Sequence, residues 1–180
     1  MNESRGSLVA IGVGNVLLGD DGVGVRVIEC LRALAAGDPE AIPAGTTFVD
    51  GGTLGLQLLP WLRGARGVLV VDAADLGGLP GAVSVRRDTR AWTADSDVQQ
   101  AGGATGAAGV AELLGTARLL GLLPPALSVV GIGVEDLGPG LGLSDRVAAA
   151  LPRAIRVALR ELLVLDARAA CEPQPAGATA

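Results

Sequence analysis

The feature that most constrains the fold is the alternation of short, continuously apolar segments with segments of helical spacing. The clearest apolar segment is Gly67–Val71, and Leu8–Ile11 and Leu127–Val134 share its character. A strand with apolar residues on both sides is buried on both faces, which is typical of parallel sheets covered by helices. The alternation therefore predicts a three-layer α/β fold, in which a twisted, mainly parallel, five-stranded sheet lies between helices.

The remaining elements follow from the same periodicities. We expect two more strands at Thr46–Val49 and Ala82–Arg87, the second near a sheet edge because its polar and apolar residues alternate. Helical spacing predicts helices over about residues 20–36, 54–62 and 110–121. A further helix should follow a short turn after Ser144, carry Pro152 in its first turn and end near Leu165. Arg90–Ala108 has little periodicity and is interpreted as a loop.

Length and cysteine usage indicate one domain in a reducing environment. The chain has 180 residues, 49% of them hydrophobic, so it can bury a core without covalent cross-links. We expect a single domain over residues 1–165 and a loose tail over 166–180. Cys30 and Cys171 lie far apart, which favours unpaired thiols. No uninterrupted apolar run reaches membrane-spanning length, so we expect a cytoplasmic protein.

Missing residue types exclude several kinds of chemistry. The sequence contains no His and no Lys. A chain of this composition, acting alone, cannot build a Ser-His-Asp triad, a His-ligated zinc site, a phosphate loop with its lysine or a Schiff-base lysine. The net charge of −5, the scattered arginines and the presence of only one Phe and two Trp argue against nucleic-acid binding. Carboxylates, arginines, hydroxyls, thiols and backbone groups remain.

Acidic residues follow three of the predicted strands. Asp20 and Asp21 come after the first, Asp50 ends the second and Asp72 ends the third. Because parallel strands deliver their carboxyl ends to one edge, these residues should gather there. One of Asp20 and Asp21 can cap the following helix. We predict that Asp21 and Asp72 form a functional pair, either as metal ligands or as carboxylates that share a proton and activate water. Asp50 is expected to order its own loop or to support the pair.

Two further motifs are weaker. Gly12 and Gly14 resemble part of a dinucleotide fingerprint, but position 17 is Leu where a third Gly is needed, so a tight turn is the favoured reading. A nucleotide-binding module stays open as an alternative on these glycines alone.

Arg86, Arg87 and Arg90 form a small basic cluster. It is interpreted as a solvated face, with contact to an acidic peptide as the alternative.

The segment Ile11–Val25, which reads IGVGNVLLGDDGVGV, resembles the opening signature of the hydrogenase maturation endopeptidases. Asp50–Thr53, Val70–Ala73 and Gly109–Gly121 match the later blocks of that family in order, and the similarity covers about residues 8–165. The resemblance implies a twisted, mainly parallel sheet. It also implies an endopeptidase that removes the C-terminal extension of a nickel–iron hydrogenase large-subunit precursor after nickel insertion, with that precursor as its partner.

The resemblance also implies a nickel-recognition site. Its first two ligands map onto Asp21 and Asp72, the pair already singled out by position. Its third ligand is a His, and Gly106 holds that place, three residues before Gly109. We expect substrate contacts from polar residues of the matching blocks, namely Asn15, Asp50 and Thr53.

Three explanations for the missing His remain open. A residue of the same loop could substitute for it, with Asp97, Gln99 and Gln100 as candidates. Cysteine thiolates of the precursor could carry the nickel, so that this chain binds the free ion only weakly. Alternatively, the chain is a non-catalytic maturation factor that binds the large subunit without cutting it.

Overall fold

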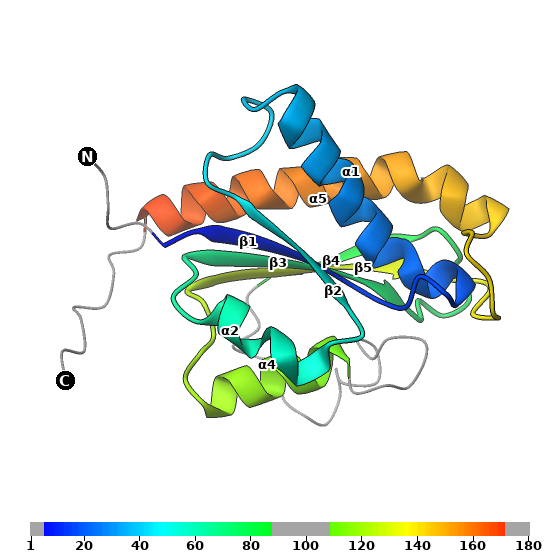
Figure 1. Cartoon of the computed structure of the whole chain (residues 1–180), viewed down its shortest axis with the longest axis horizontal. Helices are drawn as coiled ribbons and strands as arrows, with labels where there is room; N and C mark the ends of the chain where they lie inside the picture. The colour runs from blue at the N-terminus through cyan, green and yellow to red at the C-terminus, as the bar shows by residue number, and fades with distance from the viewer. Residues whose placement is uncertain (1–5, 88–108, 172–180) are drawn as a thin grey trace.

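A five-stranded sheet forms the centre of the molecule, whose computed structural model describes residues 6–87 and 109–171 (Figure 1). The strand order is β2-β1-β3-β5-β4; β4 is an edge strand antiparallel to β5, and the other pairs are parallel. The strands are β1 (Leu8–Val13), β2 (Thr47–Gly52), β3 (Gly67–Ala74), β4 (Val83–Arg87) and β5 (Ala126–Gly133). The helices are η1 (Gly19–Gly22), α1 (Val23–Gly37), η2 (Gly55–Leu58), α2 (Leu59–Leu62), α4 (Val110–Leu119) and α5 (Asp145–Cys171).

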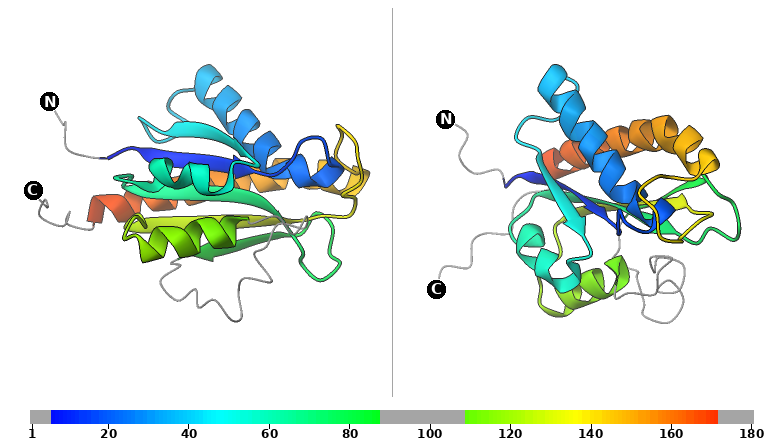
Figure 2. Two further views of the ribbon diagram at one scale, coloured as in Figure 1. Left: turned by 60° about the horizontal axis from the view of Figure 1, so that its bottom comes forward. Right: turned by 45° about the vertical axis from the view of Figure 1, so that its right-hand side comes forward.

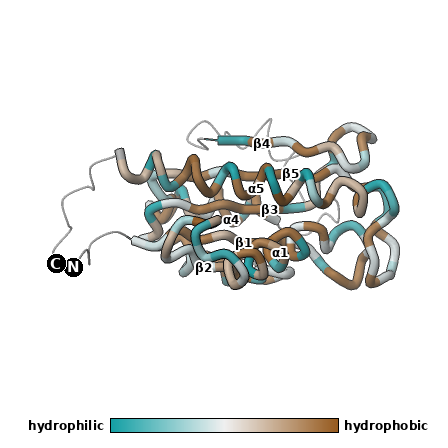
Figure 3. Tube along the Cα trace, turned by 90° about the horizontal axis from the view of Figure 1, so that it is seen from above, coloured by the Kyte–Doolittle hydropathy of each residue, from teal (hydrophilic) through white to brown (hydrophobic). Residues whose placement is uncertain are grey.

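Helices cover both faces of this sheet. α1 and α5 lie on one face and α2 and α4 on the other, as Figures 1 and 2 show from three directions. The first face is packed around Leu31, Leu69 and Leu162, and the second around Val70 and Leu113. Along α5, hydrophobic and hydrophilic residues alternate with the helical turns (Figure 3). The predicted three-layer α/β fold is confirmed.

β3 is buried along its whole length, as its apolar sequence predicts. Val68 and Val70 face the α4 side, and Leu69 and Val71 face the α5 side. Each such side chain contributes about 1.5–3 kcal/mol when it leaves water, so this strand anchors both cores. In the described residues, no helix is both long and apolar enough to cross a membrane.

Two strands extend further than the sequence predicts. β2 continues through Asp50 to Gly52, and β3 continues through Asp72 to Ala74. The added residues of β3 pair with β5 as far as Gly133. Asp72 is therefore a strand residue whose side-chain direction is set by the sheet, and not the first residue of a loop.

The C-terminal helix corrects a second expectation. α5 is one helix from Asp145 to Cys171 with Pro152 inside it, whereas a turn and a shorter helix ending near Leu165 were predicted. Pro152 has no N–H for the Ala148 carbonyl, but both residues are exposed, so water can bond that carbonyl. Buried side chains lie on both sides of the proline, Val147 before it and Ala154 after it. Packing of these side chains against the sheet thus stabilises one continuous helix despite the hydrogen bond that is lost at Pro152.

Candidate functional site

The strand order places a topological switch point between β1 and β3. From β1 the chain continues to β2 on one side, and β3 then pairs with β1 on the other, so β1 and β3 flank a topological switch point. Ligands of open parallel sheets bind outside the carboxyl ends of the strands at such a point. Asp21 follows β1 in η1, and Asp72 lies near the carboxyl end of β3. The two acids therefore flank the expected binding position.

The loop after β1 folds back on Asp21. The Asn15 backbone N–H donates to Asp21 Oδ2 at 2.7 Å. Gly14 has a φ of +127°, and a Cβ at that position would collide with the Asp21 carbonyl oxygen. Only glycine allows this approach, because other residues rarely adopt such a φ and carry the clashing carbon. The glycine therefore fixes where the Asp21 carboxylate lies.

A second glycine brings the start of α1 against β3. A Cβ on Gly24 would collide with the carbonyl oxygens of Val71 and Val13. Because these carbonyls belong to the backbone, neither can turn aside for a larger residue. The close approach holds η1, and with it Asp21, next to the strand position that precedes Asp72.

Asp72 is a buried carboxylate with an unsatisfied oxygen. The residue is 4% exposed, and its Oδ2 has no hydrogen-bond partner among the described residues. Burial, followed by the negative charge of Asp21, raises the pKa of Asp72 to about 7, against an opposing hydrogen bond from the Ala73 backbone. Asp21 and Asp72 thus lie at the same edge of the sheet, near enough for the charge of one to affect the other. An unsatisfied buried oxygen costs free energy, so Asp72 is not placed there for stability.

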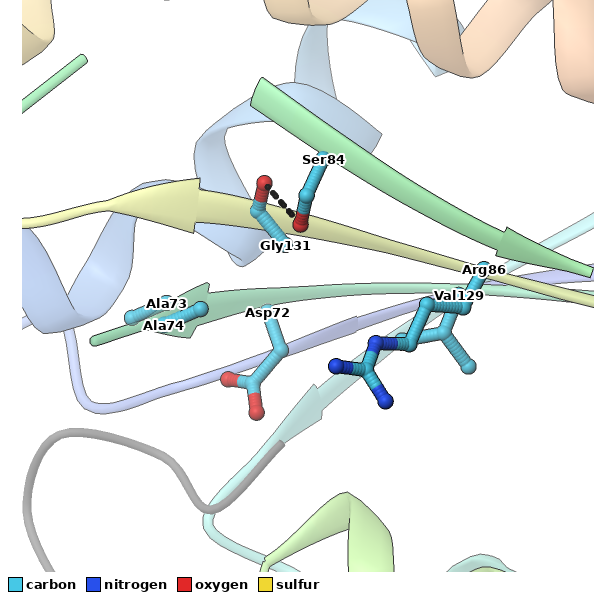
Figure 4. A pocket seen from close by; sticks show the side chains of 7 residues that line it. All are labelled: Asp72, Ala73, Ala74, Ser84, Arg86, Val129 and Gly131. Carbon is cyan, nitrogen blue, oxygen red and sulfur yellow. Dashed lines mark hydrogen bonds between the residues drawn. The ribbon is translucent and has the colours of Figure 1, made fainter. Parts of the chain in front are cut away.

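A small pocket opens beside Asp72 on the α4 side of the sheet. Asp72, Gly131 and Ser84 form one row across β3, β5 and β4, and Arg86 lies on the same face one pair further along β4. All four residues line the pocket, whose volume is about 20 Å³ (Figure 4). The unsatisfied acid thus lies in a space that takes about one water-sized group.

Asp20 has a different role from the helix cap that the sequence suggests. Neither Asp20 nor Asp21 caps α1. Asp20 instead accepts hydrogen bonds from the backbone N–H groups of Glu135, Asp136 and Ser144 and from Ser144 Oγ, at 2.6–2.9 Å. Burial would raise the pKa of Asp20, but these hydrogen bonds outweigh it and hold the pKa below its ordinary value. Asp20 ties the loop after β1 to the loop after β5, which lie side by side in Figure 2.

The three residues expected to contact substrate lie on the rim of the same edge. Asn15 Oδ1 accepts from the Leu17 N–H at 3.0 Å, so this side chain shapes its own turn. Asp50 is exposed and its Oδ1 accepts from the Gly52 N–H at 3.1 Å, which orders its own loop as predicted. Thr53 is exposed beside it.

Comparison with known proteins assigns the family. Residues 25–161 match the family described as hydrogenase maturation protease. The chain is 35% identical over 162 residues to a hydrogenase expression/formation protein HupD of Rhodobacter capsulatus, covering 86% of this chain and 70% of that protein. It is 30% identical to the hydrogenase 2 maturation protease of Escherichia coli K12, covering 86% of this chain and 90% of the relative. This chain belongs to the hydrogenase maturation protease family.

A solved structure of the family has the same fold. The hydrogenase maturating endopeptidase HybD of E. coli superposes with a TM-score of 0.66 at 30% identity, over 86% of this chain and 93% of that one. The resemblance seen in the sequence blocks is thereby confirmed, and so is the mainly parallel sheet that it implied.

Of the three ligand positions that the resemblance implies, the described residues include two, Asp21 and Asp72. Within residues 6–87 and 109–171, His, Cys, Asp and Glu form no group of three that could hold a metal ion. Gly106 and the candidate substitutes Asp97, Gln99 and Gln100 lie outside the described residues. The unsatisfied Oδ2 of Asp72 beside Asp21 suits a cation. Two carboxylates alone nevertheless make a weak site for a borderline metal such as nickel.

Two polar features of this family member were not found from the sequence. Glu161 on α5 is 1% exposed, and no role is predicted for it from the sequence. It falls at helical spacing in a buried stripe with Ala154, Ala158 and Leu165. An acid on an apolar face was the available signal. Arg86 was read as part of a solvated cluster, but it lines the pocket beside Asp72.

Proposed function

We propose that this chain is an endopeptidase that removes the C-terminal extension of a nickel–iron hydrogenase large-subunit precursor after nickel insertion. The observation that carries the proposal is the buried Asp21–Asp72 pair with its unsatisfied oxygen, in a chain of the hydrogenase maturation protease family. An unsatisfied buried oxygen lowers the stability of the fold, so stability does not explain its presence. A group of the substrate that bonds to this oxygen would explain it.

The nickel in this proposal arrives with the precursor. A chain with no His offers nickel two carboxylates at this position, so the precursor's thiolates would hold the ion and the two aspartates would contact it. The ion then identifies a loaded precursor. Free nickel would bind this chain only weakly.

Asp72 is suited to move a proton in the cleavage step. Before the nickel-loaded precursor binds, the Asp72 carboxyl, with a pKa of about 7, exchanges its proton near neutral pH, as a general base or acid must. Asp50 and Thr53, exposed on the rim, would contact the peptide on its way to the pair. We also propose a cytoplasmic setting, which the free thiol of Cys30 supports.

The test is the mass of the large subunit after incubation of nickel-loaded precursor with the purified protein. The proposal predicts a shorter large subunit and a released C-terminal peptide. Asp38→Asn is a matched control, because Asp38 is an exposed acid in the connection between α1 and β2. It should cut like the wild type.

A second candidate is the non-catalytic maturation factor, which the absence of His favours. In the same assay it would co-purify with the large subunit and leave its mass unchanged. That result would overturn the endopeptidase.

A further inference from the structure

The two neighbouring arginines of β4 point to opposite faces of the sheet. Arg87 Nε and Nη2 donate to Glu161 on the α5 side, at 2.7 and 2.5 Å. Because side chains alternate along a strand, Arg86 faces the α4 side, where its guanidinium lies on the same side as the Asp72 carboxylate (Figure 4). Of the cluster's two described arginines, Arg87 therefore binds Glu161 and Arg86 lines the pocket beside Asp72, whereas Arg90 lies outside the described residues.

Small residues keep the pocket between Arg86 and Asp72 open. A Cβ on Gly131 would lie 2.8 Å from Ser84 Oγ and 3.1 Å from Ala74 Cβ, so a larger residue there would close the row between the two strands. The resulting volume of about 20 Å³ takes one water-sized group. A carbonyl oxygen fits this space, whereas a substrate carboxylate would be repelled by the negative charge of Asp72 and Asp21.

Arg86 is the side chain of this pocket that can donate to such an oxygen. Asp72 is an acceptor when ionised, and the hydroxyl of Ser84 donates to the Gly131 carbonyl at 3.3 Å. A guanidinium has five N–H donors, so Arg86 can serve an incoming oxygen and keep its other contacts. It also carries a fixed positive charge.

We propose that Arg86 donates hydrogen bonds to the carbonyl oxygen of the peptide bond that is cut, and stabilises the negative charge that develops on it. This inference rests on the proposed endopeptidase function. Water adds to the carbonyl carbon, its proton passes to a carboxylate of the site, the carbon–nitrogen bond breaks and the amine nitrogen takes up that proton. Arg86 keeps its own protons throughout and is a catalytic residue, because it touches the reacting oxygen.

The experiment compares single-turnover cleavage of saturating nickel-loaded precursor by wild type, Arg86→Gln, Arg86→Lys and Arg63→Gln. Arg63 is the matched control: it is exposed and precedes β3, at the end of the sheet opposite Asp72. We expect Arg86→Gln to lower the cleavage rate by about 100-fold or more, as the loss of an oxyanion donor does, with Arg86→Lys intermediate. Thermal unfolding of each variant separates this effect from a loss of fold.

The outcomes are separable. Wild-type cutting with a slow, folded Arg86→Gln and a normal Arg63→Gln supports the inference. Wild-type cutting with Arg86→Gln within twofold of it overturns the inference and leaves the proposed function standing. If Arg86→Gln unfolds, the rate of Arg86→Lys decides, and a wild-type rate there overturns it. Absence of cutting by the wild type overturns both proposals.

Discussion

Glu161 and Asp72 are both buried carboxylates beside β4 and β5, on opposite faces of the sheet. Glu161 has a partner for each oxygen: Oε1 accepts from Arg87, and Oε2 accepts from Arg87 and Ser128. Burial would raise the pKa of Glu161, but these hydrogen bonds outweigh it and lower the pKa. Asp72 has an oxygen that no described residue hydrogen-bonds, and its pKa is raised. The fold supplies hydrogen-bond donors for both oxygens of Glu161, whereas one oxygen of Asp72 can still accept a hydrogen bond from a bound group.

The largest expected effect is on the unsatisfied pair. Asp21→Asn removes the charge next to Asp72 and one of the two carboxylates to which the proposed function gives a role at the substrate. We expect precursor cleavage to fall by about 10²–10⁴-fold, the range for loss of a positioned acid or base. The mass of the large subunit over time measures it. Cleavage close to that of Asp38→Asn would remove Asp21 from the site.

Asp20 resembles Glu161 in that hydrogen bonds from the protein satisfy its oxygens. We expect Asp20→Asn to lower the free energy of unfolding by about 3 kcal/mol. An amide keeps only one acceptor oxygen and turns an NH₂ toward backbone donors that the carboxylate accepts from. Urea unfolding measures the loss. A change below about 1 kcal/mol would match an ordinary helix cap and contradict the inter-loop role.

Arg87→Gln should destabilise the α5 face by about 2 kcal/mol. It leaves the Glu161 charge with Ser128 as its remaining partner, but Arg87 itself is 42% exposed, so water can partly replace it. Cleavage at a temperature where the variant is folded should equal that of wild type. A stable variant that fails to cut would contradict the claim that the Arg87–Glu161 pair serves stability and not cleavage.

The smallest effect concerns the coupling inside the pair. The charge of Asp21 contributes to the raised pKa of Asp72, so Asp21→Asn should lower that pKa from about 7. Carbon-13 NMR of the side-chain carboxyl over pH measures the titration directly. An unchanged pKa would mean that burial alone raises it and that the two acids are not coupled.

Positions along the chain predicted the Asp21–Asp72 pair, because parallel strands gather their carboxyl ends at one edge. The role of Asp20 could not be predicted in this way. A cap is a local pattern, whereas the partners of Asp20 lie 115–124 residues away and become visible only when the two loops meet.

Adjacent residues illustrate the same limit. Arg86 and Arg87 belong to one basic cluster in the sequence, and strand alternation places them on opposite faces of the sheet. The pairing of the strands is needed to show that Arg86 is the one that lies on the same face as Asp72. At Pro152 the local rule gives a wrong prediction. It predicts that a helix starts there, but the helix continues through the proline because residues on both sides of it are packed in the core.

The most direct test measures cleavage and stability on one preparation of Asp72→Asn. The folded state raises the Asp72 pKa from 3.8 to about 7, so it favours the neutral acid. Wild-type stability should therefore fall by about 1.4 kcal/mol per pH unit as pH rises through that window, and the variant should escape this loss. The account predicts that at pH 8 Asp72→Asn is more stable than wild type and does not shorten the precursor. A variant that cuts normally, or that is less stable than wild type, would contradict it.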